Sequence, residues 1–168
     1  MSEVKVSIDN VSQLSKAILE EAAPQIITEL CRFAKEELLS AYNNSTYAKD
    51  KTQNLADSYV WGVYYKGKLQ QHGFLTSGKK ATRPRRVSYT NKSVFGRDEA
   101  QAFISSYKPQ TNMFEVIFAA EMYYGSYLEG GTKRNKKYIV LSSIINSISQ
   151  YENLTITFNK TYPDGTPF

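Results

Sequence analysis

An amphipathic run over residues 11–42 constrains the fold of this 168-residue chain more than any other feature. Its apolar residues recur at steps of three and four, the spacing of one face of an α-helix. They are Leu14, Ile18, Ala22, Ile26, Leu30, Phe33, Ala34, Leu38 and Ala41. At about 1.5 Å per residue, an unbroken helix of this length spans roughly 50 Å. We therefore expect a sheet or a neighbouring subunit to cover the apolar stripe.

Pro24 lies inside this helical pattern. Proline lacks a backbone N–H and biases the preceding residue, here Ala23, away from helical angles. The segment is therefore either one kinked helix or two helices, with Pro24 opening the second.

The rest of the chain mixes short strands and helices. The aromatic and β-branched run at 59–65 predicts a strand, followed by a hairpin turn at Lys66-Gly67 and a brief return over 68–71. Residues 98–107 and 138–151 predict helices, and residues 113–120 and 154–158 predict strands. Because the strands do not alternate regularly with crossover helices, we expect an α+β fold. In it, the long N-terminal helix packs on a mostly antiparallel sheet, beside a C-terminal helix.

The length favours a single domain over residues 1–168. Residues 72–97 show no helical period and contain several Gly and Pro residues, so we expect a protruding loop or hairpin arm that is mobile. Residues 160–168 contain the turn signal Pro163-Asp164-Gly165 and predict a flexible tail.

Charge is distributed unevenly along the chain. Residues 58–97 hold nine basic side chains and no acidic one, which leaves 12 basic and 16 acidic residues elsewhere, a net −4. The densest part is the basic segment, residues 79–86, with Lys79, Lys80, Arg83, Arg85 and Arg86. Three interpretations remain open: a solvated loop, a contact with an acidic protein surface, and a contact with nucleic-acid phosphates.

The chain offers little for catalysis. It has one His, His72, between glycines and polar residues, and one Cys, Cys31, on the apolar side of the first helix, where we expect a buried inert thiol. Scattered acids, such as Asp57, Asp98 and Glu99 or the pair Glu121 and Glu129, are more typical of a surface than of a metal or carboxylate site. We therefore expect no catalytic residue, metal ion, cofactor or small-molecule substrate.

The termini and hydropathy bear on location. The first residues lack the basic region and apolar run of a signal peptide, so we expect none. No apolar stretch approaches the roughly 20 residues that a membrane-spanning helix needs, so we expect no membrane contact.

An aromatic segment follows the strand at 113–120. It contains Tyr123, Tyr124 and Tyr127 and then Leu128, Glu129, Gly131 and Thr132. The tyrosines could anchor a neighbouring subunit, or the segment could be a packed corner.

This segment resembles a hallmark of the tail-completion family of long-tailed bacteriophages, also described as head–tail joining, neck or minor tail proteins. That family shows an Ala-x-x-Tyr-Ala-x-Tyr/Val-Glu-x-Gly-Thr stretch after a strand, and here Ala120 precedes the aromatic segment in the same order. A second family feature is a Thr-Gly-x-Leu-x-x-Ser turn that leads from a loop into a strand. Thr52, Asn54, Leu55 and Ser58 match this turn, whereas Gln53 stands in place of the family's Gly.

The resemblance spans about residues 11–151 and includes the closing helix at 138–151. It implies a non-enzymatic structural subunit that forms a ring, often a hexamer, in the virion neck after assembly in the host bacterial cytoplasm. Its implied partners are copies of itself, the phage connector or adaptor, and the tail tube or terminator proteins. DNA would pass through such a ring only as cargo. The basic arm would either face that DNA or reach a neighbouring ring, and we favour the neighbouring ring because tight phosphate binding would hinder the passage of DNA.

Two other functions compete with this one. The first is a nucleic-acid-binding module that uses residues 79–86, and the second is a small metal-dependent nuclease that uses Asp and Glu. Near-absence of His and Cys beside 13 tyrosines favours the structural subunit over the enzyme.

Overall fold

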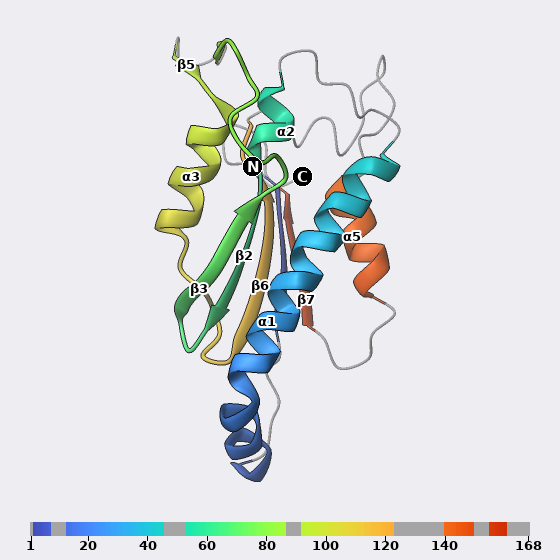
Figure 1. The fold of residues 1–168 in the computed structure, drawn as a ribbon, viewed down its shortest axis with the longest axis vertical. Helices are drawn as coiled ribbons and strands as arrows, with labels where there is room; N and C mark the ends of the chain where they lie inside the picture. Colours follow the sequence, from blue (N-terminus) through green and yellow to red (C-terminus); the bar gives the residue numbers. More distant parts are fainter. Residues whose placement is uncertain are drawn as a thin grey trace.

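A computed structural model of the chain describes residues 2–7, 13–45, 53–86, 92–122, 140–149 and 155–160. Five strands form one sheet in the order β3-β2-β6-β1-β7 (Figure 1). They are β1 (Ser2–Ser7), β2 (Tyr59–Tyr65), β3 (Lys68–Phe74), β6 (Phe114–Ala120) and β7 (Thr155–Lys160). Every pairing in this sheet is antiparallel. The predicted α+β class, with a long N-terminal helix on an antiparallel sheet, is therefore confirmed.

Strand β6 lies at the centre of the sheet, and all seven of its residues are buried. Successive side chains of a strand point to opposite faces of the sheet. Val116 and Phe118 accordingly contribute to the core on one face, while Ile117 and Ala119 contribute to the core on the other. A strand that is apolar on both faces requires a helical layer on each side.

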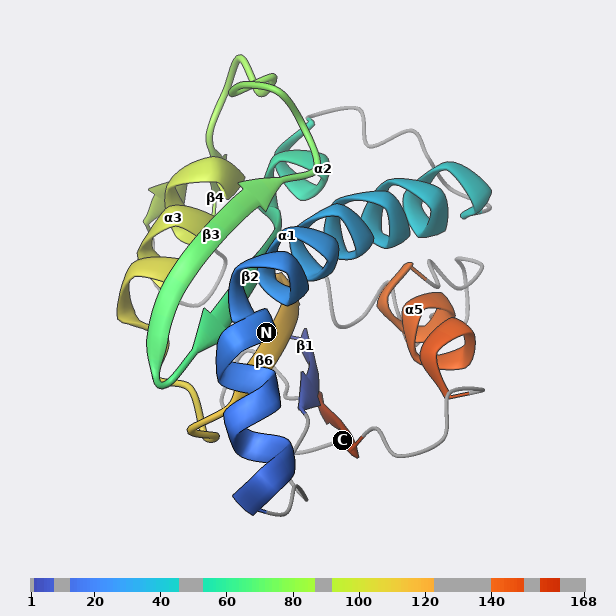
Figure 2. The ribbon, with the colours of Figure 1, turned by 60° about the horizontal axis from the view of Figure 1, so that its bottom comes forward.

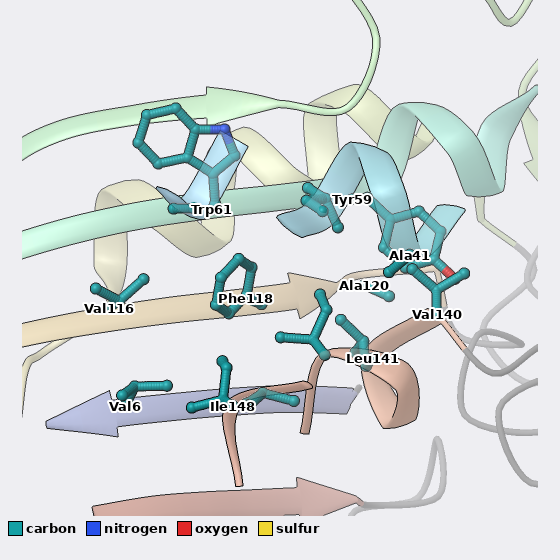
Figure 3. Close-up of a cluster of buried hydrophobic side chains, with 14 of the residues drawn as sticks. Val6, Ala41, Tyr59, Trp61, Val116, Phe118, Ala120, Val140, Leu141 and Ile148 are labelled. Carbon is teal, nitrogen blue, oxygen red and sulfur yellow. The ribbon is translucent and has the colours of Figure 1, made fainter. Parts of the chain in front are cut away.

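Helices α1 (Gln13–Asn44) and α5 (Val140–Ile148) cover the first face. Figure 3 shows side chains from both helices converging with those of three strands. The labelled members of this core are Val6, Ala41, Tyr59, Trp61, Val116, Phe118, Ala120, Val140, Leu141 and Ile148. The Ser147 hydroxyl also donates a hydrogen bond to Glu37 at 2.9 Å, which ties α5 to α1.

Helix α3 (Gly96–Ser106) covers part of the opposite face, over β2 and β6. Its Ile104 packs where Gly62 of β2 has no side chain: a Cβ at Gly62 would lie 2.7 Å from Ile104 Cδ1. Beyond α3, the buried Glu115 carboxylate accepts hydrogen bonds from the Tyr107 hydroxyl and from the Gln110 N–H at 2.8 Å. These bonds satisfy a charge buried in the central strand and hold the connection between α3 and β6.

The alternatives left open at Pro24 resolve to one helix, since α1 runs unbroken from Gln13 to Asn44. Figure 2 shows the axis of α1 changing direction between its darker N-terminal part and its lighter C-terminal part. A proline removes one intrahelical bond and bends the helix at that turn. The Thr28 hydroxyl donates a hydrogen bond to the Pro24 carbonyl at 2.9 Å.

The buried face of α1 differs from the predicted stripe. The buried residues are Ala23, Cys31, Ala34, Leu38 and Ala41, whereas Ile18, which we assigned to the apolar stripe, is 61% exposed. Two residues four positions apart in an α-helix are separated by one full turn plus about 40°. Positions linked by repeated steps of four therefore rotate gradually away from the buried face of the helix. The first turns of α1 also project beyond the sheet (Figure 1). Lys66, in the turn between β2 and β3, forms an ion pair with Glu20 of α1, in which the Nζ and Oε1 atoms lie 2.8 Å apart.

Local predictions in the middle of the chain are confirmed. The strand at 59–65 has the predicted bounds, and the turn after it has positive φ at Lys66 (50°) and Gly67 (75°), as a type I′ hairpin requires. The return strand is longer than predicted and reaches Phe74. Strand β1 and the short helix α2 (Asn54–Ser58) were not predicted.

Candidate functional site

The base of the predicted arm is organised around the carboxylate of Asp57, which is fully buried in α2. Its Oδ2 accepts the backbone N–H groups of Lys80 at 2.7 Å and Ala81 at 2.8 Å. Its Oδ1 accepts the Thr76 hydroxyl at 2.7 Å. Three donors from one stretch of loop therefore converge on one buried acid, and hydrogen bonds to an ionised acceptor are stronger than neutral ones.

Asn54, one turn before Asp57, joins the two sides of the arm. Its Nδ2 donates to the Arg83 carbonyl at 2.8 Å, and its Oδ1 accepts the Gly96 N–H at 3.0 Å. Only glycine fits at position 96, because a Cβ there would collide with the backbone oxygen of Asn54. The chain entering the arm and the chain leaving it are thus fixed to the same side chain.

Arg97 braces the loop from the other side. One of its guanidinium nitrogens donates to the Thr76 carbonyl at 2.6 Å and to the Gly78 carbonyl at 3.1 Å. The guanidinium lies 3.9 Å from the Phe74 ring centroid. Burial lowers the pKa of Arg97, and the charge of Asp57 opposes that shift.

The five residues of the basic segment are all exposed above this base. Lys79 is held in place, since its Nζ lies 3.1 Å from Asp98 Oδ2 and 3.2 Å from the Phe95 ring centroid. Arg85 and Arg86 form strand β4 (Arg85–Arg86), which pairs with β5 (Ser93–Val94). The predicted arm is therefore a two-stranded hairpin on an anchored base, as far as residues 72–86 and 92–97 are described. Its predicted mobility stays a prediction.

The turn motif lies inside the protein. Gln53 has φ 59° and ψ 0°, the left-handed conformation, and α2 begins directly after it. Leu55 packs in the main core, and the Ser58 hydroxyl donates to the Leu55 carbonyl at 2.8 Å. Asn54 and Ser58 are also buried, so these matched residues build the turn and the base of the arm rather than an exposed surface. Thr52 lies outside the described residues.

The aromatic segment also lies outside the described residues, which end at Met122 and resume at Val140. This applies to the candidate interface residues Tyr123, Tyr124, Tyr127, Leu128, Glu129, Gly131 and Thr132. They remain sequence-based candidates.

Glu121, the last acid before that segment, has an unusual environment. Its Oε1 is buried and has no hydrogen-bond partner among the described residues. Burial above all, together with the nearby carboxylates Glu3 and Glu99, raises the pKa of Glu121 to about 8. At neutral pH the side chain is therefore mostly protonated.

The remaining reactive side chains are not gathered into a reaction centre within the described ranges. Cys31 is buried, and burial raises the pKa of its thiol. The His72 ring packs edge-on against Phe74, with the ring centroids 5.5 Å apart. Among the described residues, no three His, Cys, Asp or Glu side chains are grouped to hold a metal ion. No helix in that part of the chain is both long and apolar enough to cross a bilayer.

No protein-family model matches the chain, and no similar protein was found among curated sequences or solved structures. The arrangement that the chain itself provides is a set of exposed cations on a base fixed by buried hydrogen bonds. Such an arrangement suits the binding of an anionic surface, because little conformational entropy is lost on docking.

Sequence reasoning missed the anchoring role of Asn54 and Asp57. Asp57 was weighed only as one of several scattered acids. A usable signal was nonetheless present: a polar loop follows the strand, and its buried N–H groups must find acceptors. Two short polar side chains three residues apart, directly before a buried strand, are suitable acceptors.

Substituting Asp57 with Asn tests the anchor. The amide offers one oxygen to three donors and places an NH₂ group against them, so we expect a loss of about 1–3 kcal/mol in the free energy of unfolding. Amide hydrogen exchange at Lys80 and Ala81 should accelerate. Asp98→Asn, at an exposed partner of Lys79, is the matched control and should change stability by less than about 0.5 kcal/mol. Unchanged exchange at Lys80 and Ala81 in Asp57→Asn would contradict the anchor.

Glu121→Gln tests the buried carboxyl. Between the ordinary pKa of 4.5 and the folded value of about 8, the folded state keeps a proton that the unfolded chain releases. Stability therefore falls across this window as pH rises. The variant, which carries no charge, should match the native protein near pH 4.5 and exceed it by about 1–4 kcal/mol above pH 8. Chemical denaturation at several pH values measures this. A stability difference that does not grow with pH would show that Glu121 ionises normally.

Proposed function

We propose that this chain is a structural subunit of the head–tail junction of a tailed bacteriophage. It assembles with copies of itself into a ring, for example a hexamer, and docks between the connector and the tail tube or terminator proteins. Its place of action is the virion neck, after assembly in the host bacterial cytoplasm. DNA passes through the ring as cargo, and the chain catalyses no reaction.

The observation that carries this proposal is the conformation of Gln53. The family pattern has Gly at this position, and a Gly is favoured where φ is positive. Gln53 has φ 59°, and the buried Leu55 and Ser58 follow in the order that the pattern requires. A non-Gly residue in this conformation costs roughly 1–2 kcal/mol. Retention of the turn despite this cost supports the resemblance at the point where the sequence departs from it.

The surface of the domain also suits ring formation. A ring closes by head-to-tail contacts, which need two different surfaces on each subunit. The described residues offer an exposed hairpin of cations at one end and an uncovered outer face of α1 along one side. These surfaces differ in charge and in shape, as heterologous contacts require.

A second candidate is the nucleic-acid-binding module. The observation that favours it is the exposure of Lys80 and Arg83 on a fixed base, since clustered cations bind phosphates with release of counterions. No helix carries these cations, so reading of bases in a groove is not expected.

Light scattering combined with a gel shift on the same sample separates the two candidates. For the structural subunit, we expect a mass above the 19.1 kDa of one chain at high protein concentration, and no retardation of duplex DNA at physiological salt. A chain that stays monomeric and binds DNA tightly, with affinity that falls steeply as salt rises, would replace the structural proposal with the nucleic-acid module.

A further inference from the structure

A continuous line of exposed side chains runs along the outside of α1. Its members are Ile18, Glu21, Gln25, Glu29, Arg32, Glu36 and Leu39, and every one of them is exposed. Steps of three and four keep them on one face, opposite the buried face that contains Ala34 and Leu38. We call this line the outer stripe. From Ile18 to Leu39 it covers about 30 Å.

The outer stripe carries both apolar and acidic side chains. Ile18 is 61% exposed and Leu39 is 46% exposed, and they are two of the three large apolar side chains that the described residues expose. Three glutamates lie between them and outnumber the single arginine, Arg32. The stripe therefore has an exposed apolar residue at each end and a net negative charge between them, so a cationic surface is its electrostatic complement.

The cations of the basic segment are the complementary surface. Lys80 and Arg83 make no side-chain hydrogen bond or ion pair with any described residue, whereas their backbone is fixed by Asp57 and Asn54. On the outer stripe, Glu21 likewise has no described partner. Opposite charges on two fixed surfaces favour association and select the orientation in which they meet.

The basic segment and the N-terminal part of the outer stripe lie too far apart to meet within one chain. Figure 1 places the basic segment beside β5 at one end of the domain, and the N-terminal half of α1, which carries Ile18 and Glu21, at the other end. One chain contains both a basic and an acidic part. Residues 58–97 hold nine cations and no acid, and the net charge of all other residues is −4. A second copy of the chain therefore supplies a surface with the required charge.

We propose that the basic segment of one copy docks on the outer stripe of α1 in the next copy. Lys80 and Arg83 lie against Glu21, and the docked hairpin covers the exposed Ile18 beside it. Because the two surfaces are different, the contact is head-to-tail and can be repeated around a ring. The inference rests on the proposed self-assembly and names the surfaces that carry it.

A charge exchange tests this contact. One variant carries Lys80→Glu and Arg83→Glu, and a second carries Glu21→Lys, which leaves the ion pairs of Arg32 with Glu29 and Glu36 intact. Sedimentation velocity over a range of concentrations should show each variant associating about tenfold more weakly than the native chain. An equal mixture of the two variants should regain association, because the reversed charges again oppose each other. Lys68→Glu, an exposed cation of β3 outside the basic segment, is the control and should associate normally.

The outcomes separate the inference from the proposed function. Native association with no effect of either variant would overturn this contact and leave self-assembly in place. A native chain that does not associate at any concentration would overturn both. Loss of DNA binding in Lys80→Glu/Arg83→Glu, with self-association unchanged, would assign the basic segment to nucleic acid and overturn the contact. Circular dichroism of each variant shows that it is folded before the comparison.

Discussion

Burial of the central strand on both faces sets the plan of this protein. All seven residues of β6 are buried, so the sheet needs α1 and α5 on one side and α3 on the other. Helix α1 is longer than the sheet that it covers, and its bend at Pro24 does not end it. Its first turns therefore project past the sheet, and no described residue covers its outer face. The surface that we assign to self-assembly is a consequence of how the core is covered.

A second constraint acts at one end of the sheet. The loop after β3 is polar and would leave backbone N–H groups without acceptors if it packed on the sheet alone. Asp57 and Asn54 supply those acceptors from α2, and Gly96 allows the close approach of α3. The same bonds that satisfy the buried backbone also fix the base of the basic segment. Packing and function are thus coupled through one buried carboxylate and one buried amide.

The elements that could be predicted from the sequence are those whose structure is determined by residues close together in the chain. Strand β2 and the Lys66-Gly67 turn follow from a short apolar run and from glycine's tolerance of positive φ. Strand β1 escaped prediction because it is short and carries Glu3 and Lys5, and it is defined by pairing with β6 and β7, which are far away in the sequence. The exposure of Ile18 depends on where the sheet ends. The anchors of the basic segment depend on contacts across 19 to 42 residues, such as Asn54 with Gly96.

The central claim is that copies of this chain meet through the basic segment and the outer stripe. Carbodiimide cross-linking of an equal mixture of ¹⁴N- and ¹⁵N-labelled chains, followed by mass spectrometry, tests it most directly, because the reagent joins amines to carboxylates in contact. The account predicts mixed-isotope peptides that link Lys80 to Glu21 of a different chain. Mixed-isotope links confined to other segments, or links only within single chains, would contradict it.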